Sequence, residues 1–249
     1  MTGRLKAKRF VSDSTVLLEF DCPEIAAAAR PGQFVEIQVS ETPYPLYRRP
    51  FSFFDADGDA FSILFKIAGT GTQMISCWEP DYVADFIGPL GNGFSWKVSD
   101  EKAILVGGGI GVSPLNFLAR KLIKEGKRVS LLYAPKRDSA LLNELTCDGA
   151  EVFCAENRKQ TQEELRDMLS LCEQPVNVYT CGPDGFMKFV VDNAAEFGLC
   201  SYASLETRMA CGFGICMVCA ARIRVGDEIK HMRVCSDGPV FSGTEVVFE

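Results

Sequence analysis

The sequence predicts a multidomain protein of the β plus α/β class, with an antiparallel β-barrel, then a parallel-sheet domain, then a small cysteine-rich domain. Three observations predict this order. Short apolar runs, broken by Gly, Pro and Asp, fill residues 1–98. Strand-like and helix-like segments alternate over residues 99–203. Four of the 11 cysteines fall in residues 204–249, and we expect domain boundaries at these changes of pattern.

The N-terminal segment is typical of a small all-β barrel, because Val, Ile and Phe dominate its apolar runs. The run DADGD at Asp55–Asp59 predicts a hairpin turn, since Asp and Gly tolerate the positive φ that such turns require. The same run lacks the remaining spaced ligands of a calcium loop. The expected strands lie in residues 16–20, 34–39, 51–68 and 82–88.

The middle segment predicts a parallel sheet, because its strand-like runs are apolar throughout and suit burial on both faces. Helical spans between them suit right-handed crossovers. The expected strands are residues 103–109, 128–134, 151–156 and 176–182, and the expected helices are residues 113–125, 139–146, 162–171 and 184–197.

The C-terminal segment is too short for a good core of its own, so a metal centre is expected to stabilise it. Its cysteines are spaced C-x4-C-x2-C-x15-C, the pattern of plant-type [2Fe–2S] ligation. Glycines 212 and 214 allow the backbone to fold tightly and to aim N–H groups at cluster sulfurs. A four-Cys zinc site is the alternative, but it usually has two C-x2-C pairs, and only one is present here. The candidate ligands are Cys211, Cys216, Cys219 and Cys235.

Composition excludes several other functions. A net charge of -7 gives little reason to approach nucleic acid or anionic lipid, so neither is expected as a partner. No run of about 18 apolar residues and no apolar signal core appears, so we expect a cytoplasmic protein. His231 is the single histidine, which excludes a two-His Rieske cluster and predicts an ordinary surface residue.

A glycine-rich run, GGGIGVSPL, follows the first strand of the middle segment and precedes a helix. Glycines permit close approach of a pyrophosphate, and the helix N-terminus offers N–H donors and partial positive charge. The run differs from the G-x-G-x-x-G fingerprint, and a plain tight turn is the alternative. The candidate residues are Gly107, Gly108, Gly109, Ile110 and Gly111.

Two further motifs complete the set of candidate binding residues. Cys181, Gly182 and Pro183 follow a buried strand, so they share the carboxyl edge of the sheet with the glycine run, and the two loops could hold a nicotinamide. In the barrel, Arg49 can neutralise a phosphate and the Ser52 hydroxyl can hydrogen-bond a ring nitrogen. The nearby Gly-Thr turn offers N–H groups to a pyrophosphate.

The order R-x-F-S, G-T, GGGIGVSPL and CGP resembles the ferredoxin–NADP reductase superfamily, in which a flavin-binding barrel precedes a nicotinamide-binding α/β domain. The C-terminal ETRMACGFGIC and VCSDGPVF are similar to the electron-transfer subunits of NAD-linked dihydroorotate dehydrogenase. This resemblance spans essentially the whole chain.

The resemblance implies three cofactors in three domains: FAD in residues 1–98, NAD in residues 99–203 and a [2Fe–2S] cluster in residues 204–249. The glycine run and Cys181–Pro183 would bind NAD, and the four cysteines would hold the cluster. The FAD residues implied are Arg49, Pro50, Phe51, Ser52, Leu64, Phe65, Lys66, Gly71 and Thr72.

The resemblance also implies the reaction. A separate FMN-containing catalytic subunit would oxidise dihydroorotate, and electrons would cross through the cluster and FAD to NAD⁺ in pyrimidine biosynthesis. The assembly implied is a heterotetramer, with no catalytic base in this chain. Lys136 and Arg137 leave NADP open, since they could recognise a ribose 2′-phosphate. A reductase subunit serving another redox partner and a zinc-stabilised interaction protein are the alternatives.

Overall fold

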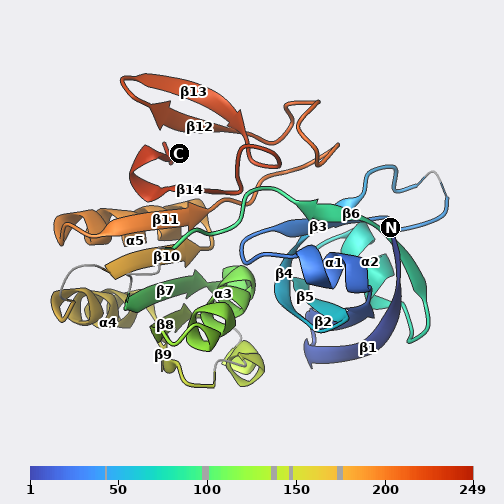
Figure 1. Cartoon of the computed structure of the whole chain (residues 1–249), viewed down its shortest axis with the longest axis horizontal. Helices are drawn as coiled ribbons and strands as arrows, with labels where there is room; N and C mark the ends of the chain where they lie inside the picture. The colour runs from blue at the N-terminus through green and yellow to red at the C-terminus, as the bar shows by residue number, and fades with distance from the viewer. Residues whose placement is uncertain (43, 97–100, 136–138, 146–147, 173–175, 249) are drawn as a thin grey trace.

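A closed, six-stranded antiparallel barrel forms the N-terminal part of the molecule, in a computed structural model that describes residues 1–42, 44–96, 101–135, 139–145, 148–172 and 176–248. Figure 1 shows the barrel in blue to cyan. Its strand order is β1-β2-β5-β4-β3-β6. The strands are β1 (Thr2–Ser12), β2 (Thr15–Asp21), β3 (Phe34–Ile37), β4 (Arg49–Asp57), β5 (Ala60–Lys66) and β6 (Val83–Leu90), with short helices α1 (Pro23–Ala28) and α2 (Thr70–Ser76).

Phenylalanines fill the barrel interior. Phe20, Phe53, Phe61 and Phe86 are all buried, with neighbouring ring centroids 5.0–5.5 Å apart. Aromatic pairs at this spacing are favourable beyond their buried area. The predicted hairpin is confirmed, and Gly58 takes a φ of 58° in its turn.

A six-stranded sheet forms the second part, in the order β14-β11-β10-β7-β8-β9. Apolar side chains cover both faces, with α3 on one and α4 and α5 on the other, as the uninterrupted apolar runs predict. The strands are β7 (Lys102–Gly108), β8 (Arg128–Ala134), β9 (Glu151–Cys154), β10 (Val176–Cys181), β11 (Cys200–Ser204) and β14 (Val240–Ser242). The helices are α3 (Val112–Lys124), α4 (Arg158–Ser170), α5 (Asp184–Glu196) and the 3₁₀ turns η1 (Gly109–Gly111) and η2 (Ser139–Glu144).

Two features of this sheet differ from expectation. The predicted helix at residues 139–146 is only the 3₁₀ turn η2 over its described part. The sheet is also not purely parallel, because β14 returns from the C-terminal segment and pairs antiparallel with β11. The sequence hides β11, since CSYAS is small and polar rather than apolar.

The C-terminal segment packs onto both other parts. Its hairpin joins β12 (Ala220–Val225) to β13 (Glu228–Arg233), and η3 (Gly243–Glu245) follows β14. Cys219, Cys235 and Phe241 share a buried cluster with Phe34 of the barrel and Met187 of α5. The expected small core is therefore shared with its neighbours.

The barrel and the sheet are joined through α3, which lies between them (Figure 1). The Asn116 side chain donates to the carbonyl of Phe54 at 3.1 Å, and Arg120 forms an ion pair with Asp55. Among the described residues, no helix is long and apolar enough to cross a bilayer.

Candidate functional site

The four candidate cluster ligands lie on two adjoining segments. Cys211 is half-buried and Cys216 is exposed, whereas Cys219 and Cys235 are buried. The Sγ atoms of Cys219 and Cys235 are 3.2 Å apart. Burial and the neighbouring Cys219 raise the pKa of Cys235 to about 12, so two thiolates here need positive charge between them. Iron bound between them would supply that charge.

The loop around Cys211 presents N–H groups to sulfur. Burial acts to raise the pKa of Cys211, but the backbone N–H groups of Cys216, Phe213 and Ile215 outweigh it and lower the pKa to about 6. Donors of this kind stabilise an anionic sulfur. The loop is therefore built to favour a thiolate.

Glycine is required in this loop for space as well as conformation. Gly214 has a φ of 90°, and a Cβ there would lie 2.8 Å from the Ser236 Oγ.

Among the described residues, no three His, Cys, Asp or Glu side chains converge where one metal ion could sit. The cysteine spacing, C-x4-C-x2-C-x15-C, is that of plant-type [2Fe–2S] ligation and has only one of the two C-x2-C pairs usual in a four-Cys zinc site.

Glu36, on β3, lies against the loop that carries Cys211, Cys216 and Cys219, which we call the cluster loop. Glu36 was not predicted from the sequence. It is 1% exposed, and neither carboxylate oxygen has a hydrogen-bond partner. A Cβ on Gly212 would lie 2.7 Å from its Oε1. Burial raises the pKa of Glu36 to about 7, although Arg48 and Arg49 oppose this. The sequence signal that could have revealed Glu36 is a single acidic residue within the apolar run FVEIQV.

A cavity of about 310 Å³ lies between the barrel and the sheet. All of the predicted FAD residues except Arg49 and Gly71 line it, and Ile110 of the glycine run closes its far side. Those two lie together nearby, because a Cβ on Gly71 would sit 2.8 Å from Arg49 Nε. The FAD residues lining the cavity are Pro50, Phe51, Ser52, Leu64, Phe65, Lys66 and Thr72.

Thr72 serves its own helix with its side chain. Its hydroxyl oxygen accepts from the backbone N–H groups of Ala68 and Gly69, at 2.9 and 3.1 Å, and donates to the carbonyl of Gly69. The hydroxyl therefore holds the start of α2 in shape.

Two polar residues in the cavity, Glu206 and Thr207, had no role predicted from the sequence, and Ser113 of the predicted helix N-terminus lines it too. The Ser113 Oγ and Thr207 Oγ1 atoms are buried without a hydrogen-bond partner. Glu206 Oε1 lies 4.0 Å from Cys181 Sγ. Burial raises the pKa of both groups. Glu206 and Thr207 follow β11, the strand that the sequence concealed.

The two candidate dinucleotide loops meet at the carboxyl edge of the sheet, where Cys181 pairs in register with Gly107. A Cβ on Gly111 would lie 2.5 Å from the carbonyl oxygen of Cys181, and one on Gly182 would lie 3.1 Å from the Cα of Gly108. The loops thus contact each other directly. That they hold a nicotinamide stays a prediction, and such a ligand would lie across their shared open edge.

The other candidate residues are Lys136, Arg137, His231 and Pro183. Lys136 and Arg137 lie outside the described residues. His231 is exposed on β13, as predicted. Pro183 is exposed just before α5, where a ligand can reach it.

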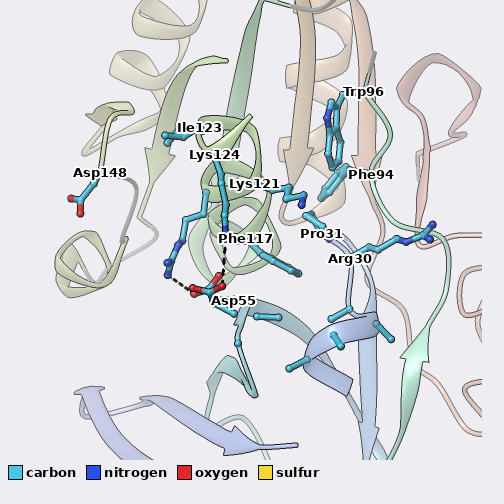
Figure 2. Close-up of a pocket in the computed structure, with 18 residues that line it drawn as sticks. Arg30, Pro31, Asp55, Phe94, Trp96, Phe117, Lys121, Ile123, Lys124 and Asp148 are labelled. Atoms are coloured by element: carbon cyan, nitrogen blue, oxygen red, sulfur yellow. Dashed lines mark hydrogen bonds and ion pairs between the residues drawn. The ribbon is translucent and has the colours of Figure 1, made fainter. Parts of the chain in front are cut away.

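A second, larger cavity of about 960 Å³ opens on the other side of α3 (Figure 2). Phe117, Lys121 and Lys124 form one wall, facing Asp55 on strand β4 of the barrel. The ion pairs Arg120–Asp55 and Lys124–Asp57 lie in it. None of the predicted cofactor residues lines this crevice, so it belongs to the junction between barrel and sheet.

Comparisons with known proteins identify the relatives of this chain. The family described as "Iron-sulfur cluster binding domain of dihydroorotate dehydrogenase B" matches residues 206–247, which include all four candidate cysteines. The Desulforamulus reducens protein named "Dihydroorotate dehydrogenase B (NAD(+)), electron transfer subunit" is 35% identical over 99% of this chain and 98% of its own length. The protein of the same name from Geobacillus kaustophilus is 34% identical over 99% of this chain and its whole length.

Solved structures show the same architecture. An NADH-dependent reduced ferredoxin-NADP oxidoreductase, described for flavin-based electron bifurcation, matches 99% of this chain and 90% of its own with a TM-score of 0.84 and 26% identity. Phthalate dioxygenase reductase matches 94% of this chain and 77% of its own with a TM-score of 0.65 and 18% identity, which is a likeness of fold alone. The predicted fold class and the predicted family are both confirmed: the chain belongs to the family of electron transfer subunits of NAD-linked dihydroorotate dehydrogenase B.

Proposed function

We propose that this chain carries electrons from an FMN-containing catalytic subunit, which oxidises dihydroorotate, through a [2Fe–2S] cluster and FAD to NAD⁺. One observation carries the proposal. Leu205, Glu206, Thr207 and Met209 line the smaller cavity, and Cys211 follows only two residues later. Ile110 of the glycine run lines the same cavity, so the predicted FAD residues, the glycine run and the segment that leads to Cys211 meet there.

In this proposal the residues of the chain bind the cofactors and shield them from water, and the substrate base belongs to the catalytic subunit. FAD, when bound, exchanges electron pairs with a nicotinamide and single electrons with a cluster. Arg49 would neutralise its phosphate, and Ser52 would hydrogen-bond its ring system. Phe51 and Phe65 pack at a centroid distance of 5.0 Å and would exclude water from one wall. Gly107–Gly111 and Cys181–Pro183 would hold NAD⁺ at the sheet edge.

The wider assignments form part of the same proposal. Residues 1–98 would form the FAD domain, 99–203 the NAD domain and 204–249 the cluster domain. The four cysteines would be the iron ligands, and the assembly would be a heterotetramer in pyrimidine biosynthesis. A cytoplasmic location suits a protein whose described cysteines form no disulfide.

The partner would dock over the exposed edge of the cluster loop. Phe213, Ile215, Met217 and Val218 are 46–76% exposed and surround Cys216, the exposed ligand. We call these four residues the apolar rim. Exposed apolar groups gathered at one loop are typical of a protein–protein contact, and a partner over Cys216 would bring its flavin close to the cluster.

Replacing Ile215 by Asp is expected to weaken binding of the catalytic subunit about tenfold or more, because a buried charge at an interface centre is costly. Leu171→Asp is the matched control, since Leu171 is 79% exposed on the far end of α4. Titration calorimetry with both subunits loaded with cofactor measures the effect. Equal affinities for the two variants would contradict the assignment of the rim.

Replacing Arg49 by Gln is expected to weaken FAD retention about tenfold, because a charge-assisted bond to phosphate contributes about 1.5–3 kcal/mol. Flavin fluorescence released on dilution measures retention. Arg4→Gln is the control, since Arg4 on the barrel surface contacts only the exposed Asp81 among the described ion pairs. Unchanged retention in Arg49→Gln would remove Arg49 from the FAD site.

Co-expression with the catalytic subunit tests the function itself. Purified complex should show flavin and [2Fe–2S] absorbance and should reduce NAD⁺ when given dihydroorotate. Zinc at the four cysteines, or a lack of flavin, would refute the proposal. Cofactors without dihydroorotate-dependent activity would favour a reductase that serves another partner.

A further inference from the structure

Two separate segments carry the four candidate ligands, and something must hold them in register. Cys211, Cys216 and Cys219 lie on the loop before β12, and Cys235 lies in the turn after β13. One backbone hydrogen bond joins the segments, from the N–H of Val234 to the carbonyl of Cys219 at 3.0 Å. That bond fixes the buried pair of cysteines, and in the outer part of the loop the backbone N–H of Gly214 donates to the sulfur of Cys235.

The Arg233 side chain spans the two segments. Its Nη1 donates to the carbonyl of Gly214 at 2.8 Å, in the middle of the cluster loop. Its Nε and Nη2 donate to the two carboxylate oxygens of Asp237, each at 3.0 Å. The flat guanidinium is suited to such a fork, whereas an ammonium cannot make all three bonds in one plane.

Asp237 is itself fixed to the turn. Its Oδ2 also accepts the backbone N–H of Arg233 at 2.8 Å, and its own N–H donates to the carbonyl of Arg233 at 2.8 Å. The Asn92 side chain, from the segment after the barrel, donates to the carbonyl of Asp237 at 3.1 Å. The guanidinium is therefore anchored to a turn that also touches the barrel side of the molecule.

The same guanidinium places a positive charge between Gly214 of the cluster loop and the turn that carries Cys235. It is 39% exposed, so water screens part of the effect, and the Asp237 carboxylate offsets another part. The Arg233–Asp237 ion pair thus places one positive and one negative charge near the buried cysteines, Cys219 and Cys235. Charge and hydrogen bonding near the sulfurs are the protein's means of setting a cluster's potential.

From these contacts we infer that Arg233 is a positioning residue that fixes the cluster loop to the turn carrying Cys235. The Arg233–Asp237 ion pair also sets the reduction potential of the bound cluster. The inference rests on the proposed function, because it requires a [2Fe–2S] cluster at these four cysteines. The bond to Gly214 governs how long the cluster is held, and the balance of the ion pair governs its potential.

Four variants of the assembled holoenzyme test this: Arg233→Gln, Arg233→Lys, Asp237→Asn and the control Arg224→Gln. Arg224 lies on the neighbouring strand β12 and is exposed. The first readout is the rate of iron release to a ferrous chelator. The second is the reduction potential from an EPR-monitored titration.

Arg233→Gln should release iron about 10–100-fold faster and shift the potential downward, since it breaks the bridge and leaves Asp237 uncompensated. Arg233→Lys should also release iron faster but keep a potential near that of the unaltered protein. Asp237→Asn should shift the potential upward. Arg224→Gln should match the unaltered protein in both readouts.

Unchanged iron release in both Arg233 variants would overturn the positioning role. Shifts of the same sign in Arg233→Gln and Asp237→Asn would overturn the assignment of the potential. If Arg233→Gln fails to assemble a cluster while Arg224→Gln does so normally, the positioning role is supported. Absence of a [2Fe–2S] signal from the unaltered protein would instead refute the proposed function.

Discussion

Cys216→Ser is expected to abolish dihydroorotate-dependent reduction of NAD⁺ while leaving the oxidation of NADH by artificial dyes nearly intact. Serine is a poor ligand for iron beside the thiolates that the cluster requires, so electrons lose their route from the partner. The cavity lined by the predicted FAD residues contains none of the four cysteines, and dyes can take electrons at the flavin. Steady-state assays of both reactions on the assembled complex measure the separation.

Cys200→Ser is the matched control for this prediction. Cys200 is an exposed thiol at the start of β11, in the sheet rather than in the cluster loop. It should retain both activities and the full iron content. If Cys216→Ser loses both activities equally with its FAD content unchanged, the proposed division between flavin and cluster is wrong.

Gly111→Ala is expected to destabilise the protein by about 1–3 kcal/mol and to weaken NAD⁺ binding, because the added methyl group has no room. Its Cβ would lie 2.5 Å from the carbonyl oxygen of Cys181 and 2.7 Å from the amide nitrogen of Gly182. Both are backbone atoms, so the two loops must separate to admit it. Chemical denaturation and the KM for NAD⁺ measure the two effects.

Gly185→Ala provides a control of identical chemistry. Gly185 lies in α5, and a Cβ there meets no atom within 4 Å. Alanine should stabilise the helix by about 0.4–1 kcal/mol through the unfolded chain. A Gly111→Ala protein as stable as Gly185→Ala would show that the loops are not in the direct contact described.

Much of the fold could be predicted because long apolar runs mark buried strands. β8 has the expected bounds, and α3 and α5 begin and end within one residue of them. β1 was missed because TGRLKAKRFVS is rich in charged side chains, although the strand pairs with both β2 and β6. β11 was missed because its residues are small and polar. Tertiary pairing, rather than local composition, makes these two segments strands.

The candidate site divides in the same way. Cysteine spacing and a glycine run are local patterns, so the sequence contains them directly. Glu36, Ser113 and Glu206 take part only because β3, α3 and the segment after β11 converge in space. No spacing rule connects them. A lone polar residue in an apolar run, as Glu36 is, was the nearest to a visible signal.

The edge strand β14 has a consequence for the speed of electron flow. Three residue pairs join it to β11, so the chain leaves the cluster loop and returns at once to the sheet that carries the dinucleotide loops. A redox module on a free tether has to search for its acceptor before every hop. In this molecule β14 fixes the cysteine-bearing segment to the sheet, so a hop from a cluster held there would need no diffusive search, and only the outer partner would have to arrive.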